Sequence, residues 1–200
     1  MKKLFFIVTC LFGMTTLNAQ SNSGDFTLAP QIGVAFSTYY ANNEVTYNSR
    51  TSFAIGVIGE YYFNDRWSLR SGLLYSPMGA KDGMGNIDKL DFISIPVNAN
   101  WHFGKNRNWY LNFGPSVSFL TKAESKLSNG SSIDIKDFVK NTDIGLNLGI
   151  GYKFDINDDF QLYIDYQGYG GFVTVAEDGI LPYDIRNSSS AINVGGVFKL

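Results

Sequence analysis

The only histidine of the chain is the first candidate for acid–base chemistry. His102 lies at the end of the alternating segment 93–103, directly before the short polar stretch 104–108. Histidine titrates near neutral pH, so it is the side chain that most often acts as a catalytic acid or base. No serine or acidic residue is near His102 in the sequence. A structural histidine is therefore favoured, and we predict no catalytic residue.

Charged residues at alternate positions are the second candidate. Glu60 and Arg70 are equally far from a short turn centred on Asp65, so we expect them to lie opposite each other on paired strands. They belong to a set of five charges on segments that are otherwise small and uncharged: Glu60, Arg70, Lys153, Asp165 and Lys199. These charges could form a network that fills the interior of the fold, or a selectivity ring in a narrow pore.

A third candidate is the turn 155–159, which carries Asp155, Asn157 and Asp159 at the alternate spacing of a calcium loop. A complete loop of this type has about twelve residues, a glycine at its turn and a distal glutamate. Here an apolar segment already resumes at Phe160. A solvated turn is favoured. The sequence predicts no metal site and no cofactor, and it contains no phosphate-binding glycine loop.

The first residues predict export. Two lysines precede an apolar run that ends near Leu17, and small and polar residues follow. This is the layout of a secretory signal peptide, so we predict removal of residues 1–19 and a mature domain at 20–200. The run is too short for a membrane-spanning helix, which needs about 20 apolar residues. Cys10, the only cysteine, would leave with the signal, so no disulfide is expected.

Period-two alternation recurs along the mature chain, whereas helical periodicity does not. In the clearest segment, 143–154, one face is apolar and the other carries three Gly residues together with Asp, Asn and Lys. Eight segments alternate in this way: 26–37, 53–63, 67–76, 93–103, 109–119, 143–154, 160–167 and 191–200. Short polar turns and longer links connect them in turn, which is typical of an up-and-down barrel in the outer membrane.

The composition of the two faces decides which of them meets water. The polar face consists mostly of Gly, Ser, Asn, Gln and Ala, and the apolar face carries almost no charge. Small uncharged residues suit a narrow interior and make a poor soluble surface. Aromatic residues flank each short turn on the apolar face, where they would form an interfacial girdle: Phe63, Trp67, Phe103, Trp109, Phe154 and Phe160.

These patterns predict an all-β fold, an eight-stranded antiparallel up-and-down transmembrane β-barrel, rather than a soluble lipocalin-like barrel. A barrel of this size encloses only enough room for its side chains or one small ligand, which favours the filling network over the pore. Pro30, Pro96 and Pro115 lie inside the predicted strands. Because proline cannot donate to a ladder, we expect bulges or breaks in the pairing there.

The last residues are expected to close the barrel, because an unpaired strand edge has no water to bond in hydrocarbon. They also resemble the C-terminal signal that the barrel-insertion machinery reads. Asn193, Gly195, Phe198 and Leu200 match its pattern of a polar residue, a glycine and two hydrophobic residues, although a final aromatic is more usual than Leu200. The resemblance implies the insertion machinery as a partner and the cell outer membrane as the location.

Three stretches carry a family resemblance: SLRSGLLYSPMGA (68–80), LDFISIPVNANWHF (90–103) and YLNFGPSVSFL (110–120). They resemble the PorT-like, porin-family outer-membrane barrels of Bacteroidota in the run Gly72 to Tyr75, the pair Ile95-Pro96 and the pair Gly114-Pro115. The resemblance implies the barrel fold and says almost nothing about activity, since a fold does not define a function.

These features together predict a non-enzymatic outer-membrane barrel with a filled polar lumen and four long outer loops. Its expected role is structural, or the binding of a ligand or protein partner at the cell surface through the loops. A narrow porin for small solutes is the alternative, and an enzyme is third. The lipid bilayer is the expected surrounding. The formal net charge of −2 gives no reason to expect a nucleic acid as a partner.

Overall fold

The computed structural model describes residues 23–41 and 46–200. The predicted signal peptide 1–19, including Cys10, lies outside the described residues, and so does the start of the predicted mature domain at 20–22. The described part of the chain contains no helix that is long and apolar enough to cross a membrane.

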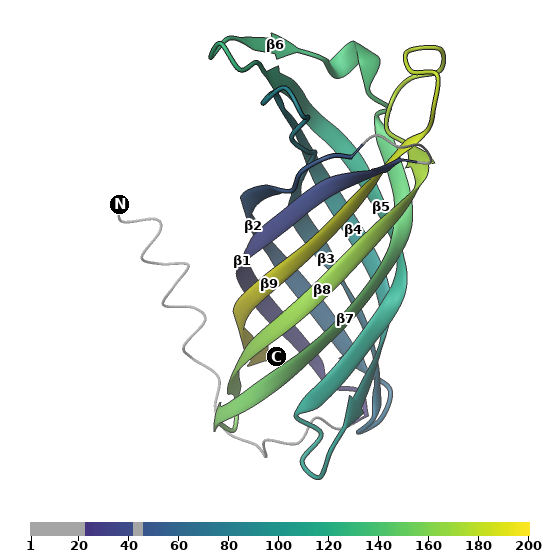
Figure 1. The fold of residues 1–200 in the computed structure, drawn as a ribbon. Coiled ribbons are helices and arrows are strands. Elements are labelled where there is room, and N and C mark those ends of the chain that lie inside the picture. The colour runs from purple at the N-terminus through teal and green to yellow at the C-terminus, as the bar shows by residue number, and fades with distance from the viewer. Residues whose placement is uncertain (1–22, 42–45) are drawn as a thin grey trace, which may run out of the picture.

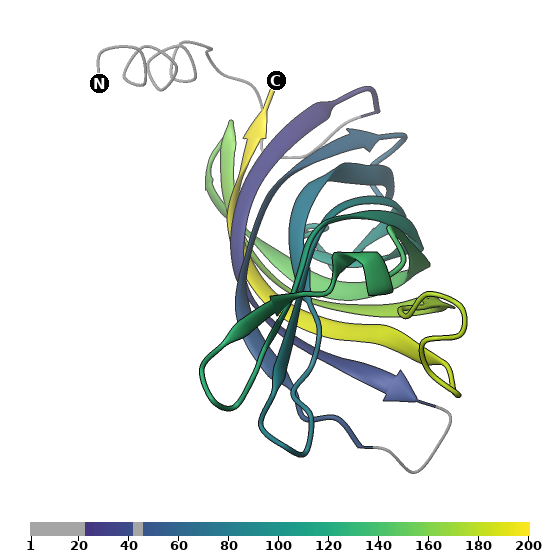
Figure 2. The ribbon, with the colours of Figure 1, turned by 90° about the horizontal axis from the view of Figure 1, so that it is seen from above.

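Eight long strands form a closed antiparallel barrel (Figures 1 and 2). They follow one another around the barrel in chain order, and β9 pairs with β1 to close it, from Thr27 opposite Lys199 to Ala41 opposite Ile185. The strands are β1 (Phe26–Ala41), β2 (Arg50–Tyr62), β3 (Trp67–Met78), β4 (Ile87–Phe103), β5 (Trp109–Lys126), β7 (Thr142–Asn157), β8 (Phe160–Thr174) and β9 (Ile185–Lys199). The predicted fold class is confirmed.

The connections differ in length between the two ends of the barrel. The short turns 63–66, 104–108 and 158–159 lie at one end, and the longer links lie at the other: 79–86, 127–141, 175–184 and the described part, 46–49, of the link between β1 and β2. The link 127–141 contains the short strand β6 (Ser132–Asp134), which extends the sheet beyond β5, and the 3-10 helix η1 (Lys136–Phe138). Outer-membrane barrels have short periplasmic turns and long extracellular loops. We therefore call the short-turn end periplasmic and the other end extracellular.

The barrel has a polar inside and an apolar outside. Along β7, Leu146 and Leu148 point outward with 51% and 63% of their surface exposed, while Gly145 and Gly149, on either side of this pair, are buried. Phe53 on β2 is 82% exposed, whereas Asn112 on β5 is completely buried. A soluble protein would bury the phenylalanine and expose the amide. The outer surface is therefore suited to lipid tails, as the sequence predicts.

A chain of aromatic contacts runs along the periplasmic end of β4, β5 and β7. Trp101 stacks on Phe103 at 5.0 Å between ring centroids, and Phe103 lies 6.2 Å from Trp109. Trp109 in turn meets Tyr152 at 4.9 Å, and Tyr152 meets Phe154 at 4.7 Å. Aromatic rings favour the headgroup level of a bilayer, so this chain marks the periplasmic membrane interface.

The three prolines break the pairing on one side of their strands, as expected. Pro30 pairs with Val57 on β2, but the β1–β9 register is interrupted between Leu28 and Gln31. The β3–β4 register stops at Ser71 opposite Val97 and resumes at Leu74 opposite Ser94, with Pro96 in the gap. The β4–β5 register skips the level of Pro115 in the same way. Each proline thus costs the wall a few ladder bonds without opening a strand on both sides.

The lipid-facing surface of β7 gives a direct test of this architecture. Leu148→Arg places a charge near the middle of the apolar band, and we expect it to lower the free energy of unfolding by about 2–4 kcal/mol. Ile156→Arg lies beside the periplasmic turn and should cost only about 0–1 kcal/mol. Urea-induced unfolding in lipid vesicles measures both values. Equal costs for the two variants would contradict a membrane band across β7.

Candidate functional site

The periplasmic half of the lumen is filled by a buried charged cluster around Glu60. The Oε2 atom of Glu60 accepts a 2.9 Å hydrogen bond from Lys153, which lies across the barrel on β7. Its Oε1 atom lies 2.5 Å from the Ser68 hydroxyl, which donates to it, and 2.6 Å from the donating amide of Asn100. Nε2 of His102 is 2.8 Å from the same oxygen. Glu60 therefore ties β2 to β3, β4 and β7.

A second ion pair lies beside the first. Nη2 of Arg70 is 3.1 Å from Oδ2 of Asp165 on β8, and both side chains are buried. The same carboxylate accepts hydrogen bonds from Tyr110 at 2.9 Å and from Asn193 at 2.8 Å. The Arg70 guanidinium also lies over the rings of Tyr110 and Tyr163, 5.1 Å and 5.5 Å from their centroids. Cation–π contacts and charge-assisted hydrogen bonds offset part of the cost of burying the charges.

The structure places four of the five predicted lumen charges together. Glu60 and Arg70 face each other across the β2–β3 register, as their spacing indicates, and each finds an oppositely charged partner on the far wall. The prediction is wrong for Lys199. Its ammonium pairs with Asp25 at 2.7 Å, because residue 199 lies at the periplasmic rim, where the β9 strand ends.

His102 has partners that the sequence does not place near it. Strand pairing brings Ser68 to 3.0 Å and Glu60 to 2.8 Å, and both contact the same ring nitrogen, Nε2. The Ser68 hydroxyl donates its hydrogen to Glu60, and a carboxylate can only accept. With this hydrogen placement, Nε2 of His102 is the protonated ring nitrogen and donates to both the Glu60 carboxylate and the Ser68 oxygen. A general base would instead present an unprotonated nitrogen to the serine. The serine, histidine and glutamate are also fully buried, so this group is a structural network.

The cluster also contains four residues that the sequence does not single out: Ser68, Asn100, Tyr62 and Tyr110. Tyr62 accepts a 2.5 Å hydrogen bond from Lys153, and the other three contact the two carboxylates. A signal was present, since all four lie on the polar face of their strands. Their level in the barrel depends on the stagger of the strands, which period-two alternation does not reveal.

The extracellular part of the lumen is closed by an apolar cluster. Leu90 and Phe92 of β4 are almost completely buried there, and Met78 of β3 and Tyr39 of β1 pack with them. Residues from the outer links join the same cluster, among them Val139 and Val175. The apolar cluster therefore covers the lumen from the outside, while the charged cluster closes it toward the periplasm.

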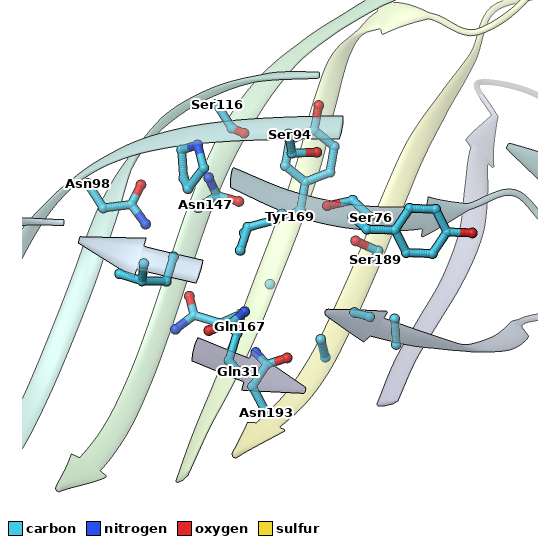
Figure 3. A pocket seen from close by; sticks show the side chains of 18 of the residues that line it. Gln31, Ser76, Ser94, Asn98, Ser116, Asn147, Gln167, Tyr169, Ser189 and Asn193 are labelled. Carbon is cyan, nitrogen blue, oxygen red and sulfur yellow. The ribbon is translucent and has the colours of Figure 1, made fainter. Parts of the chain in front are cut away.

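Between the two clusters lies a cavity of about 100 Å³ that is lined by both apolar and polar side chains (Figure 3). Figure 3 shows that its polar side chains converge from strands on different sides of the barrel. Six carboxamides line it: Gln31, Asn98, Asn112, Asn147, Gln167 and Asn193. Arg70 contributes to the floor of the cavity, and Met78 to its roof.

In the part of the chain that the structure describes, no three His, Cys, Asp or Glu side chains come close enough together to hold a metal ion. In the turn 155–159, the Asp155 carboxylate accepts hydrogen bonds from Asn108 at 2.9 Å and Gln161 at 2.5 Å. Asn157 accepts one from the backbone of Asp159. These contacts hold the hairpin turn together.

The residues of the predicted insertion signal lie on β9 and just after it. Asn193 points into the lumen, Gly195 lies beside the Tyr163 ring, and Phe198 packs on Phe160 at 4.8 Å between centroids. The backbone of Leu200 donates to the carbonyl of Phe26 on β1.

The extracellular links bind to one another. Lys140 and Val175 share a backbone hydrogen bond of 2.8 Å, and Asn48 and Lys81 form a two-bond bridge. Lys140 also pairs with Asp178 at 2.9 Å, and this ammonium lowers the pKa of the Asp178 carboxyl. Apolar side chains nevertheless remain exposed on this end: Met84, Ile133, Phe138 and Ile180. The links thus form a connected extracellular platform rather than four separate loops.

The fold and the filled lumen define the class of small outer-membrane barrels. The chain matches the Outer membrane protein beta-barrel domain family over residues 18–170, and it belongs to that family. Among solved structures, OprG of Pseudomonas aeruginosa is similar, with a TM-score of 0.58 and 10% identity over 92% of this chain and 99% of OprG. Neisserial surface protein A is also similar, with a TM-score of 0.57 and 16% identity over 88% of this chain and 97% of that protein. At these identities the likeness shows the fold alone. A comparison with curated proteins finds no match.

The pairing of Arg70 with Asp165 predicts a non-additive effect on stability. Arg70→Met leaves a buried carboxylate without its cation and should lower the free energy of unfolding by about 3–5 kcal/mol. Adding Asp165→Asn should restore part of this loss, because the remaining partners are then uncharged. Arg107→Met is the control, since Arg107 pairs with the exposed Asp65 and should cost about 0–1 kcal/mol. Urea unfolding in vesicles, followed by tryptophan fluorescence, gives the three values. A double variant no better than Arg70→Met would argue against the pairing.

Proposed function

We propose that the protein is a non-conducting outer-membrane barrel that binds a ligand or a protein partner at the cell surface. The observation that carries this proposal is the charged cluster across the lumen. Its two cations and two carboxylates are paired across the barrel by hydrogen bonds of 2.9 Å and 3.1 Å. Moving ions through this level would require these buried pairs to separate, which is costly in a low-dielectric interior.

The surface role rests on the extracellular platform. Its links are held together by backbone bonds and ion pairs, and the exposed apolar residues Met84 and Phe138 lie on them. A rigid barrel that presents a connected set of loops is a common arrangement for binding. Exposed apolar side chains on such a surface are typical of contact sites for other molecules.

The narrow porin is the second candidate and is less well supported. A selectivity ring would leave charged groups facing an open passage. Here the charges face one another, and the apolar cluster covers them on the extracellular side. Catalysis is not part of the proposal, because the buried His102 presents no free base to Ser68.

Export and insertion complete the proposal. Residues 1–19 would act as a signal peptide, and Asn193, Gly195, Phe198 and Leu200 would be read by the barrel-insertion machinery. The finer resemblance to PorT-like barrels of Bacteroidota remains a prediction that rests on the sequence stretches quoted above.

The absence of a pore is tested by electrical recording. We expect the full protein in planar bilayers to give no unitary conductance, because the paired charges fill the lumen. The periplasmic control Arg107→Ala should also give no conductance. Arg70→Ala should give none or only rare openings. Regular conductance steps in the parent protein that change size in Arg70→Ala, but not in Arg107→Ala, would establish the porin alternative instead.

The outward direction of the platform is tested by cysteine labelling on intact cells. A membrane-impermeant maleimide should label Ser131→Cys, which lies in the exposed β6 hairpin. It should not label Asn106→Cys, which is exposed in a short turn at the opposite end, until the outer membrane is permeabilised. Labelling of Asn106→Cys alone on intact cells would reverse the orientation and remove the surface-binding proposal.

A further inference from the structure

We propose that the lumen cavity, with its carboxamide lining, opens sideways to the bilayer between β2 and β3. We further propose that it binds the head of an uncharged, single-chain amphiphile whose tail remains in the lipid. This inference goes beyond the surface role, because the ligand would come from the membrane and not from the extracellular platform.

The first observation is a long interruption in the wall. The β2–β3 register runs from Tyr62 opposite Ser68 to Ile55 opposite Tyr75 and then stops. Beyond this level the Arg50 guanidinium on β2 donates to the backbone carbonyl of Met78 on β3. The two backbones pair again only at the bridge between Asn48 and Lys81. Over this interval, β2 remains paired with β1 and β3 remains paired with β4, so the missing backbone pairing is confined to the β2–β3 seam, below the Arg50–Met78 contact.

The second observation is the lining of the cavity at this seam. On β2 the cavity touches the neighbours Ala54 and Ile55, and on β3 it touches the whole run 74–78. Successive residues of a strand point to opposite faces of the wall. A cavity confined to the lumen would contact every second residue. Elsewhere in the barrel it does so, apart from the side-chain-free Gly168. Contact with both faces of β2 and β3 indicates that the cavity passes between them.

The seam lies at the depth of the outer leaflet. It begins about eight residues beyond the periplasmic end of β2, which is roughly 20 Å along the barrel axis for a strand rise of about 3.3 Å and a tilt of about 40°. The apolar band of such barrels is about 25 Å tall. Phe53 and Leu73, which are 82% and 61% exposed, flank the seam on the outside. The opening therefore leads into hydrocarbon near the headgroup level.

The polar end of the ligand follows from unpaired atoms inside the cavity. Asn98 and Asn112 are hydrogen-bonded to each other at 2.9 Å, but Oδ1 of Asn98 and Nδ2 of Asn112 have no partner in the described structure. Nδ2 of Asn147 has none either. Both Asn98 and Asn112 are more than nine-tenths buried. Buried polar groups need a partner, so these atoms call for a ligand or water that both donates and accepts.

The absence of charge in the ligand follows from the cavity floor. Arg70 is the charged side chain that lines the cavity, and it is already paired with Asp165. A charged head would bring an unmatched charge into a buried site, which costs several kcal/mol on an order-of-magnitude scale. A hydroxyl or amide head meets the carboxamides without this cost. Because the charged cluster closes the cavity toward the periplasm, the site holds its ligand and provides no route through the barrel.

Photolabelling of the full protein in lipid vesicles tests the site. The probe is a monoacylglycerol that carries a diazirine near the start of its acyl chain, and a fatty acid with the same chain is the charged comparison. After illumination, mass spectrometry maps the labelled peptides. We expect the monoacylglycerol to label residues 53–55 and 74–78 in preference to the outer face of β7 around Leu148.

Ala35→Phe is the variant that blocks the site, because Ala35 is a small buried residue of the cavity lining on β1. It should reduce seam labelling about tenfold, which corresponds to a loss of ~1.4 kcal/mol in binding free energy. Ala99→Phe is the matched control, since Ala99 alternates with buried residues of β4 and faces outward. It should leave the labelling unchanged. Retained heat-modifiable mobility on gels shows that each variant is folded.

Three outcomes would overturn the proposal. Labelling spread evenly around the barrel would show annular lipid only. Seam labelling by the fatty acid equal to or stronger than that by the monoacylglycerol would exclude an uncharged head. Seam labelling that persists in folded Ala35→Phe would mean that the head does not enter the cavity. The wild-type map decides the first two outcomes even if Ala35→Phe fails to fold.

Discussion

The need to pair every backbone N–H and C=O group in hydrocarbon governs this structure. A sheet with two free edges would leave a row of unsatisfied groups in the lipid, so the sheet closes through the pairing of β9 with β1. Closure forces each strand to present one face to lipid and the other to a narrow lumen. The apolar outside and the polar inside are both consequences of that closure, and so is the crowding of buried charges at a single level.

The lumen shows how a narrow interior accommodates charge. Glu60 and Asp165 are each surrounded by several donors, and each is matched by one cation from the opposite wall. Paired and hydrogen-bonded in this way, buried charges cost far less than isolated ones, although apolar residues of the same volume could be equally stable. What the pairs supply in addition is a set of specific contacts between strands that are far apart in the chain, such as β2 and β7.

The strands, their lipid-facing sides and contacts within one hairpin can be predicted from the sequence. Contacts between distant strands cannot, because they depend on the stagger of the strands. Alternation identifies the strands and their lipid faces because the side-chain period of a strand is fixed at two. The Glu60–Arg70 pair could be predicted because both residues belong to one hairpin with a short turn. The contact between Glu60 and Lys153 could not, since it depends on the stagger of strands around the closed barrel. Strand stagger also determines that Lys199 lies at the rim and not in the charged cluster, and that Ser68 and Glu60 lie beside His102.

The unequal lengths of the strands have a consequence for the shape that the barrel presents to the cell exterior. The aromatic rings at the periplasmic interface hold the barrel at one depth in the bilayer, so strand length translates into height. β4 and β5 have 17 and 18 residues, whereas β3 has 12. The rim is therefore slanted, with its high side at the β5–β6 hairpin (Figure 1). A molecule arriving from the medium would reach that crest before it could touch the low side, so the first encounter is biased toward one flank of the protein.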